Sequence, residues 1–366
     1  MSIKILQVFG SLHTGGAESR MMDVYRHIDR SKYSFDFVKL QPEEEFYEAE
    51  IKKLGGNILR VDSPRLCGFV EHVRQLRLCM RNGKYDAVHA HTLHHCGLVM
   101  LAAWMENIPV RITHSRSTST KRKNLATKIF VMIGRILIKL FATKRLAISQ
   151  DAGKFLFGQS SFEVLPNANE TSKYQLTSPE LAVIRRELNI PENAFVIGQI
   201  ARFESMKNHE FTLNWFTHYL GKRPEAFLVL VGDGELRAEI ERSSVKLGIA
   251  DRVLFTGVRG DVPKIIHAFN VVFLPSLYEG LGGVVLEAQA AGIPAVISEN
   301  VPESVDIGLG LVTRVSLSSP FEAWDEAVGK VITRPSYEEI NNAFEKRKLT
   351  LDYEVSRLEA IYSGKS

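Results

Sequence analysis

The sequence is poor in cysteine. Its 366 residues include three, Cys67, Cys79 and Cys96, which leave an odd number and form no CxxC pair. This pattern argues against a disulfide framework and predicts reduced thiols in a cytosolic compartment. We expect each cysteine to be a small buried side chain.

Long apolar runs are also missing. No stretch of about 18 apolar residues occurs, which is the length that a membrane-spanning helix needs. The first residues, MSIKILQVFG, lack the basic leader, long apolar run and cleavage site of a signal peptide. We therefore expect a cytoplasmic protein with no membrane span and no signal peptide.

The composition is that of a soluble globular protein, with 45% hydrophobic and 24% charged residues. A chain of 366 residues is too long for one typical core and suits two domains. Internal repeats and low-complexity segments are absent. The sequence therefore predicts two ordinary globular domains.

The net charge of +4 is unevenly distributed. Residues 1–165 contain 25 Lys and Arg against 15 Asp and Glu, and residues 111–145 contain ten basic residues and no acidic one. This basic segment is either a solvated face or a surface that attracts anionic lipid or a phosphate-bearing acceptor. Nucleic acid fits less well, because only Phe130 and Phe141 could stack on bases and no known binding motif is present.

Strand-like and helix-like stretches alternate along both halves of the chain, which indicates parallel sheets covered by helices. The predicted strands are Ile3–Phe9, Ser34–Leu40, Asn57–Val61, Ala87–Ala90, Val110–Thr113, Leu146–Ile148, Phe195–Ala201, Phe227–Val231, Val253–Thr256, Val271–Pro275 and Ala295–Ile297. The turn-rich segment Ser161–Pro191 is interpreted as the connection between two domains. Strands of two doubly wound domains would then direct their carboxyl ends to a common cleft.

One helical stretch, Lys121–Thr143, is both basic and apolar. Apolar residues recur at helical spacing, and Lys128, Arg135 and Lys139 interrupt them. Such a stripe is typical of a helix in a membrane interface, but it would serve equally as the core-facing side of a domain helix. Both interpretations remain open from the sequence, and each could hold on a different face.

The segment Pro275–Pro294, PSLYEGLGGVVLEAQAAGIP, carries the strongest functional signal. It follows a buried strand, and its glycines, including Gly282 and Gly283, allow a ligand to approach the backbone. The helix that begins near Val284 would offer free N–H groups and a positive dipole end to phosphate. Glu279 and Glu287 flank this loop, and we expect them to reach different parts of one ligand.

Two further loops suit a diphosphate. After the first strand come Gly15 and Gly16, whose spacing is not that of the GxGxxG dinucleotide fingerprint, so an NAD-dependent oxidoreductase is disfavoured. Arg202 and Lys207 follow the first strand of the second half, where two cations can converge on one diphosphate. The turn at Gly232, in Val-Gly-Asp-Gly, ends the next strand.

The histidines His89, His91, His94 and His95 cluster after one strand and raise the possibility of a metal site. No carboxylate or cysteine completes a known ligand pattern, and the chain contains no DxD motif. We therefore predict no metal and no cofactor. His114 ends the following strand, where it is either a core histidine or a donor to a ligand hydroxyl.

In order along the chain, these motifs resemble those of the retaining GT-B glycosyltransferases of family 4. The resemblance covers Gly-Gly-Ala-Glu from Gly15, His114, Pro166-Asn167, Arg202 with Lys207, the turn at Gly232 and the pair Glu279 and Glu287. Three positions depart from the family pattern. They are Asn208 for the usual glycine, Leu281 for phenylalanine and Gln289 for methionine.

The resemblance implies an α/β chain of two Rossmann-like domains facing a central cleft. Residues 1–170 would bind the acceptor, residues 171–351 would bind a nucleotide sugar, and a helix at about 352–366 would cross back onto the first domain. It assigns the diphosphate to Arg202, Lys207 and the loop at Gly15 and Gly16. It assigns the transferred sugar to His114 and Glu279, the ribose to Glu287, and the nucleotide pocket to Gly232, Leu281, Gly282 and Gly283.

The expected activity is retaining transfer of a hexose or N-acetylhexosamine from a nucleoside diphosphate sugar, most commonly a UDP-sugar, to an acceptor hydroxyl. The acceptor would be a lipid-linked or polysaccharide precursor, met at the inner membrane face through residues 111–145. A nucleotide-sugar epimerase of the same double fold, or a noncatalytic relative, is the alternative. Conversion of the donor without an acceptor would indicate the epimerase.

Overall fold

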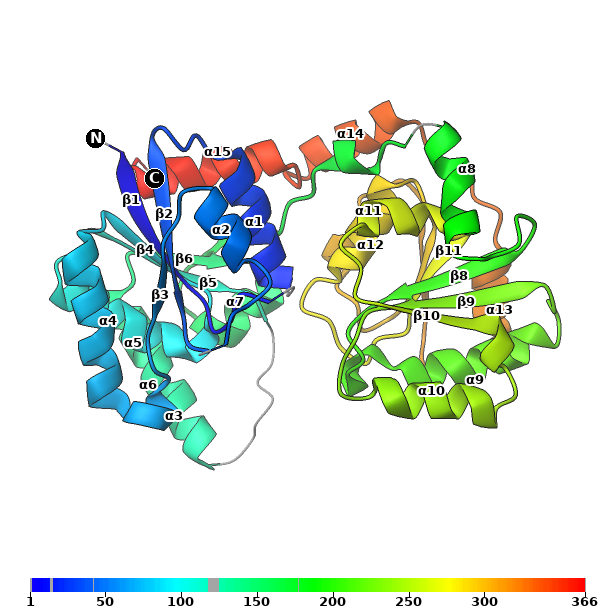
Figure 1. Cartoon of the computed structure of the whole chain (residues 1–366), viewed down its shortest axis with the longest axis horizontal. Coiled ribbons are helices and arrows are strands. Elements are labelled where there is room, and N and C mark those ends of the chain that lie inside the picture. The colour runs from blue at the N-terminus through cyan, green and yellow to red at the C-terminus, as the bar shows by residue number, and fades with distance from the viewer. Residues whose placement is uncertain (1, 14–15, 42, 118–124, 177, 366) are drawn as a thin grey trace. The chain divides into compact units, whose positions relative to one another are not determined.

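The computed structural model describes residues 2–13, 16–41, 43–117, 125–176 and 178–365. The chain divides into two compact units, Met1–Ala168 with Leu351–Ser366 and Asn169–Thr350. Each unit contains its own parallel sheet with helices packed on it (Figure 1). The predicted fold class, two doubly wound α/β domains of the GT-B type, is therefore confirmed at the level of the two domains.

The described residues of unit 1 form a sheet in the order β3-β2-β1-β4-β5-β6-β7, and every neighbouring pair is parallel. The strands are β1 (Ile3–Val8), β2 (Tyr33–Lys39), β3 (Ile58–Arg60), β4 (Ala87–Ala90), β5 (Val110–Ser115), β6 (Lys144–Ala147) and β7 (Glu163–Val164). The strand order reverses between β1 and β4. The loops after these two strands therefore open the crevice where ligands of such sheets bind.

Helices cover both faces of this sheet, as βαβ crossovers require. They are α1 (Gly16–His27), α2 (Glu48–Lys53), α3 (Pro64–Cys67), α4 (Phe69–Gly83), α5 (Cys96–Met105), α6 (Leu125–Phe141), α7 (Gln150–Phe157) and α15 (Leu351–Tyr362). The last helix belongs to this unit because Leu358, Ile361 and Tyr362 are buried among the side chains of β1 and α1. Residues from the two ends of the chain thus share one core.

Unit 2 repeats the design with the described strand order β10-β9-β8-β11-β12-β13, again all parallel. The strands are β8 (Phe195–Ile200), β9 (Ala226–Val231), β10 (Val253–Gly257), β11 (Val271–Leu274), β12 (Ala295–Ser298) and β13 (Val312–Val315). The helices are α8 (Ser178–Glu187), α9 (His209–Leu220), α10 (Arg237–Lys246), α11 (Val262–Ile265), α12 (Gly283–Ala290), α13 (Phe321–Gly329) and α14 (Tyr337–Lys346). Here the order reverses between β8 and β11.

Strands β7 and β13 and helix α8 are among the elements that the sequence interpretation did not name. The segment Ser161–Pro191 is not a simple connection, because it contains β7 and α8. Ser178-Pro179-Glu180 opens α8, and proline early in a helix is a common start signal. Strands β7 and β13 are edge strands with several half-buried residues, so they lack the continuous apolar run that marked the central strands.

The structure separates the two faces of α6. Its core-facing side meets α5 at Gly134, where a Cβ atom would lie 2.3 Å from the carbonyl oxygen of His94. Ile138 is buried on this side, but most of the apolar stripe lies on the other side and is exposed to solvent. The exposed members are Leu125, Ile129, Met132, Ile133, Ile136 and Leu140. The core-packing interpretation is therefore wrong for these six side chains.

Among the described residues, no helix combines the length and the apolarity needed to cross a membrane.

Candidate active site

The candidate site of unit 2 lies at the carboxyl edge of its sheet. The loops after β8 and β11 carry Arg202, Lys207 and Glu279, and these strands are neighbours at the point where the strand order reverses. A hydrogen bond from the Leu277 amide to the Met206 carbonyl, 2.9 Å long, joins the two loops. The fold thus brings together residues far apart in sequence where a doubly wound sheet binds its ligand.

Lys207 and Glu279 form the centre of this site. The Lys207 ammonium donates to Glu279 Oε1 at 2.6 Å, and the hydroxyl of the buried Ser276 donates to the same oxygen at 2.7 Å. The carboxylate side chain is only 8% exposed, against 21% for the lysine. This arrangement occupies one carboxylate oxygen of Glu279 and leaves the other able to accept a hydrogen bond from a hydroxyl.

Two side-chain hydrogen bonds, from Asn208 and Gln199, fix the loop that carries Lys207. Asn208 takes the left-handed conformation, with φ of 56°, and its side chain donates to the Pro275 carbonyl at 3.0 Å. The Gln199 side chain donates to the Lys207 carbonyl at 2.8 Å. Asparagine is among the few residues besides glycine that adopt this conformation readily. Asn208 therefore preserves the backbone that the family's glycine would give.

Arg202 is placed differently from Lys207. Its side chain is 63% exposed and its guanidinium lies 3.1 Å from a carboxylate oxygen of Glu204. A long side chain with this exposure can turn toward a ligand at little cost, since an exposed ion pair is weak. Arg202 is therefore available as a mobile second cation beside the fixed Lys207.

The turn at Gly232 crosses close to the backbone of the Arg202 loop. Gly232 has φ of +138°, and a Cβ atom there would lie 2.1 Å from the Ala201 carbonyl oxygen. The next residue, Asp233, accepts a 3.0 Å hydrogen bond from the Phe203 amide through its carbonyl. Glycine at 232 is thus required by backbone approach, and this turn fixes the base of the cationic loop.

The glycine-rich loop ends at Gly282, which has φ of +82° and precedes the first residue of α12, Gly283. No atom of the described residues lies within 4 Å of a Cβ position at Gly283, so the described chain leaves space beside the first residue of this helix. Leu281 is buried, whereas Glu287 is partly exposed in the second turn of α12. The Val285 amide donates to the Gly282 carbonyl at 2.9 Å, and the predicted binding of phosphate by the N–H groups of this helix start remains a prediction.

Gln289, one of the departures from the family pattern, has a structural role. Its buried amide donates to the carbonyls of Val285 and Val305 and accepts from the Ile307 amide. The bonds with Val305 and Ile307 tie α12 to the segment that follows β12, and the bond with Val285 lies within the helix. The substitution for methionine therefore anchors the helix and leaves the acids unaffected.

In unit 1, Gly15 lies outside the described residues. Gly16 begins α1. No atom of the described chain lies within 4 Å of a Cβ position there, so packing within the described chain does not require glycine at this position. The preceding loop is fixed by Glu45, whose carboxylate accepts the Leu12 amide at 2.6 Å. The donor role predicted for these glycines remains a prediction.

His114 lies on β5, fully buried beside His89 and His91. The rings of His89 and His114 are stacked with centroids 5.4 Å apart, and His89 Nε2 lies 3.2 Å from His114 Nδ1. Burial and the nearby Arg116 guanidinium hold the pKa of His114 well below its usual value, although a backbone carbonyl of Leu165 partly offsets this. His114 is therefore neutral at physiological pH.

Ligand atoms of His89, His91 and His114 lie within 4.8 Å of one another, so their geometry alone would admit a metal ion. Their chemistry suits an ion poorly. The ring nitrogens hydrogen-bond to Tyr362, to Gln7 and to each other, and the Arg116 guanidinium donates to His91. A fixed positive charge at hydrogen-bond distance opposes a cation. His94 and His95, also predicted as part of the cluster, are buried near α5 and contribute nothing to this group.

Two family models together cover most of the chain. The Glycosyltransferase Family 4 model matches residues 14–168, and the Glycosyl transferases group 1 model matches residues 182–347. The putative glycosyltransferase EpsF of Bacillus subtilis (strain 168) is 36% identical over 98% of this chain and 96% of its own.

The chain belongs to the glycosyltransferases.

A second relative also aligns over the whole of this glycosyltransferase. The capsular polysaccharide biosynthesis glycosyltransferase CapH of Staphylococcus aureus is 24% identical over 100% of this chain and 99% of its own. Among solved structures, Anabaena Alr3699/HepE in complex with UDP and glucose superposes with a TM-score of 0.73. That match has 20% identity and covers 99% of this chain and 95% of the other. It confirms the fold of the glycosyltransferase.

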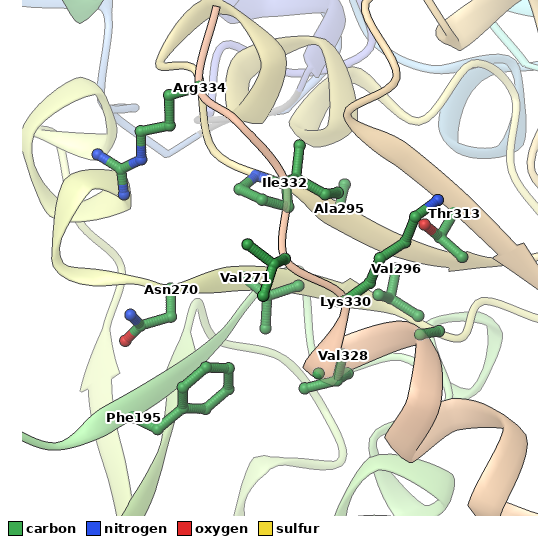
Figure 2. Close-up of a pocket in the computed structure, with 14 residues that line it drawn as sticks. Phe195, Asn270, Val271, Ala295, Val296, Thr313, Val328, Lys330, Ile332 and Arg334 are labelled. Atoms are coloured by element: carbon green, nitrogen blue, oxygen red, sulfur yellow. The ribbon is translucent and has the colours of Figure 1, made fainter.

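A cavity elsewhere in unit 2 does not belong to the site. It has a volume of about 260 Å³ and lies where β8, β11 and β12 begin, next to the segment that follows α13 (Figure 2). Phe195, Val271 and Val296 line it, with Asn270 and Arg334 at its margin. Because Lys207 and Glu279 lie at the carboxyl ends of the strands, this cavity is at the opposite edge of the sheet.

Sequence reasoning identified the charged residues of this glycosyltransferase but missed what holds them. Ser276, Gln199 and the pairing of Lys207 with Glu279 were not foreseen. The one signal available was position, since Ser276 and Gln199 flank the two loops at the ends of neighbouring strands. Their polar character within otherwise apolar strand ends could have indicated a buried hydrogen-bond network.

Proposed function

We propose that this protein transfers a hexose or N-acetylhexosamine from a nucleoside diphosphate sugar, most plainly a UDP-sugar, to an acceptor hydroxyl with retention of configuration. The observation that carries the proposal is the Lys207–Glu279 pair at the carboxyl edge of the sheet of unit 2. A cation for the diphosphate and an acceptor for sugar hydroxyls are thereby joined in one place. The solved relative that contains UDP and glucose supports the same ligand class.

The chemistry follows from where charge develops. The bond between the sugar C1 and the diphosphate oxygen breaks as the acceptor oxygen bonds to C1 on the same face. The acceptor proton passes to a phosphate oxygen of the departing nucleoside diphosphate. Lys207 and Arg202 stabilise the charge that grows on this leaving group, and the amides at the start of α12 add to it.

The remaining residues orient the substrate. Glu279 is held by Lys207 and Ser276, so its free oxygen can accept a sugar hydroxyl rather than attack C1. Glu287 would bind the ribose, and His114 would donate to a sugar hydroxyl. The backbone around Gly232, Leu281, Gly282 and Gly283 would shape the nucleotide pocket, and Gly15 and Gly16 would border the diphosphate. No metal takes part in this proposal.

The test is a panel of radiolabelled nucleotide sugars, each incubated with and without a bacterial lipid extract. We expect labelled product only with the extract, an α-linked product from an α-linked donor, and unchanged turnover in EDTA. Proton NMR of the product reads the anomeric configuration. An inverted linkage would overturn retention, loss of turnover in EDTA would overturn metal independence, and isomerised donor without acceptor would indicate the epimerase.

We also propose that unit 1 meets an anionic membrane through one surface, the α6 apolar face. It comprises the six exposed apolar side chains of α6 given above. Helix periodicity places Lys128, Arg135 and Lys139, all exposed, in a row along one side of this face. The rings of Phe69 and Phe130 stack with centroids 5.8 Å apart, which extends the apolar surface to α4.

Charge complementarity favours lipid over a second protein as the partner of this face. Two acids of the neighbouring helices are paired within the protein, Glu71 with Arg74 and Glu106 with Arg77 and Arg81. An apolar stripe flanked by lysines that form no ion pair with other described residues suits the boundary between acyl chains and anionic headgroups. The acceptor for transfer would then be a lipid-linked saccharide at the inner face of the plasma membrane.

Vesicle sedimentation checks this proposal. We expect binding to vesicles that contain phosphatidylglycerol, and little binding to pure phosphatidylcholine. Replacing Lys128 and Lys139 by glutamine should weaken binding about 30-fold, at about 1 kcal/mol for each lysine. Ile136→Asp should abolish binding, whereas Val331→Asp, at a fully exposed valine of unit 2, should not change it. Equal binding to both vesicles, or a dimer in light scattering, would contradict the proposal.

A further inference from the structure

An unbroken row of buried hydrogen bonds runs through unit 1 and ends at His114. Gln7 of β1 and His89 of β4 are paired in register, and Tyr362 from α15 contacts both side chains. All three are buried, as are His91 and His114. The directions of these hydrogen bonds follow from Arg116, which can only donate, and from the requirement that each buried donor in the row finds an acceptor.

Arg116 sets the direction of donation along this row of hydrogen bonds. Its Nε donates to His91 Nδ1 at 3.2 Å, and a guanidinium has no acceptor. His91 Nδ1 is therefore unprotonated, and the proton of the neutral ring is on Nε2. This Nε2–H donates to Gln7 Oε1 at 3.0 Å, which fixes the amide so that its nitrogen faces Tyr362.

The same logic continues to His114. Gln7 Nε2 donates to the Tyr362 hydroxyl oxygen at 3.0 Å, so the hydroxyl proton is free to donate to His89 Nδ1 at 2.8 Å. His89 then carries its proton on Nε2 and donates to His114 Nδ1 at 3.2 Å. His114 Nδ1 is left as an acceptor. The ring of His114 must carry its own proton on Nε2.

The end of the row is an unused donor. His114 Nε2 is buried and makes no hydrogen bond of good geometry with the described residues, including the Leu165 carbonyl, whose interaction with the ring partly offsets the lowering of the His114 pKa by burial. A buried donor without a partner destabilises the protein, and a ligand hydroxyl placed there would remove the penalty. Burial lowers the pKa of His89 and His91 well below the usual value, so the rings stay neutral and the row persists through the physiological range.

We infer that Tyr362 is a positioning residue that fixes the tautomer of His114, so that Nε2 presents an N–H to a substrate hydroxyl. The tyrosine acts through His89 and does not touch substrate. Without its hydroxyl, His89 is free to hold its proton on Nδ1, and Nε2 of His89 becomes an acceptor. His114 would then carry its proton on Nδ1 and lose the donor at Nε2. The last link, to the substrate, rests on the proposed function, but the tautomer does not.

The test is the tautomer itself, read from long-range proton–nitrogen correlation spectra of protein carrying nitrogen-15-labelled histidine. In the unaltered protein we expect His89, His91 and His114 all protonated on Nε2. In Tyr362→Phe we expect His114 to shift toward protonation on Nδ1. We also expect kcat to fall about tenfold, a loss of about 1.4 kcal/mol, with the KM for the nucleotide sugar unchanged.

Tyr33→Phe is the matched control. The Tyr33 hydroxyl donates to the Glu359 carbonyl of the same helix α15 at 3.3 Å, so this variant removes a hydroxyl from the same packing surface. It should leave the His114 spectrum and kcat unchanged. A His114 proton on Nδ1 in the unaltered protein, or an unchanged spectrum in Tyr362→Phe, would overturn the inference. The predicted tautomers without any sugar transfer would uphold it and overturn the proposed function alone.

Discussion

Replacing Lys207 by alanine should lower the turnover number of sugar transfer by about 10²–10³-fold, with a smaller change in KM for the nucleotide sugar. The loss of one fixed group that stabilises transition-state charge has this magnitude in other enzymes. Lys207 is fixed, because its carbonyl is held by Gln199 and its ammonium by Glu279. Initial rates of nucleoside diphosphate release, measured with saturating acceptor, give the result.

A second variant separates chemistry from stability. Lys207→Ala leaves the Glu279 carboxylate poorly solvated and without its cation, which should reduce the free energy of unfolding by about 1–3 kcal/mol. In the double variant Lys207→Ala with Glu279→Gln the unpaired charge is gone. We expect the melting temperature of the double variant to recover while its turnover stays low. If the pair had only a structural role, both the melting temperature and the turnover would recover.

Lys222→Ala is the matched control for this experiment. Lys222 also forms an ion pair, 2.7 Å from a carboxylate oxygen of Asp325, but it is half exposed and lies at the end of α9 away from the site. Its loss should change neither turnover nor stability appreciably, as for most exposed ion pairs. Turnover of Lys207→Ala at the level of the unaltered protein would remove Lys207 from the proposed mechanism.

The central strands of both sheets were predictable because they are buried on both faces. Leu228, Val229 and Leu230 in β9 are fully buried, and such continuous apolar runs are typical of parallel strands. Edge strands such as β13 contain polar residues, here Thr313 and Arg314 between two valines, and their short patterns carry less signal. The sequence thus predicted the middle of each sheet better than its margins.

The candidate site was predictable residue by residue but not pair by pair. Lys207 and Glu279 are 72 positions apart, and their contact depends on β8 and β11 being neighbours. The sequence contains no direct mark of that adjacency. The histidine row is a stronger case, because Tyr362 reaches His89 across 273 positions. A tyrosine near the end of a chain shows no sign of such a role until the last helix is placed in the core.

The two faces of α6 show that a pattern within one helix can be predicted while its orientation toward the core cannot. Periodicity correctly predicted a helix with a broad apolar stripe, but it could not decide which side meets the protein. That choice depends on Gly134, whose missing side chain allows the helix to approach the His94 carbonyl. A single small residue on the far side of the helix therefore exposes six apolar side chains to solvent.

Gly232→Ala should reduce the free energy of unfolding by about 2–4 kcal/mol, since its φ of +138° is unfavourable for alanine and its Cβ would overlap the Ala201 carbonyl oxygen. The backbone has little freedom to yield, because the Gly232 amide donates to the Gly257 carbonyl at 2.9 Å. Urea titration followed by circular dichroism measures the change.

Gly248→Ala separates the two causes. Gly248 also has a positive φ, +71°, but no atom lies within 4 Å of its Cβ position, so alanine there meets only the backbone penalty. The excess destabilisation of Gly232→Ala over this control measures the crowding against Ala201 together with the larger backbone penalty at φ of +138°. Equal destabilisation would show that the turn relaxes freely. If Gly232→Ala is the more destabilised variant, the added Cβ displaces Ala201, the residue just before Arg202. Turnover of the folded Gly232→Ala protein should then also fall.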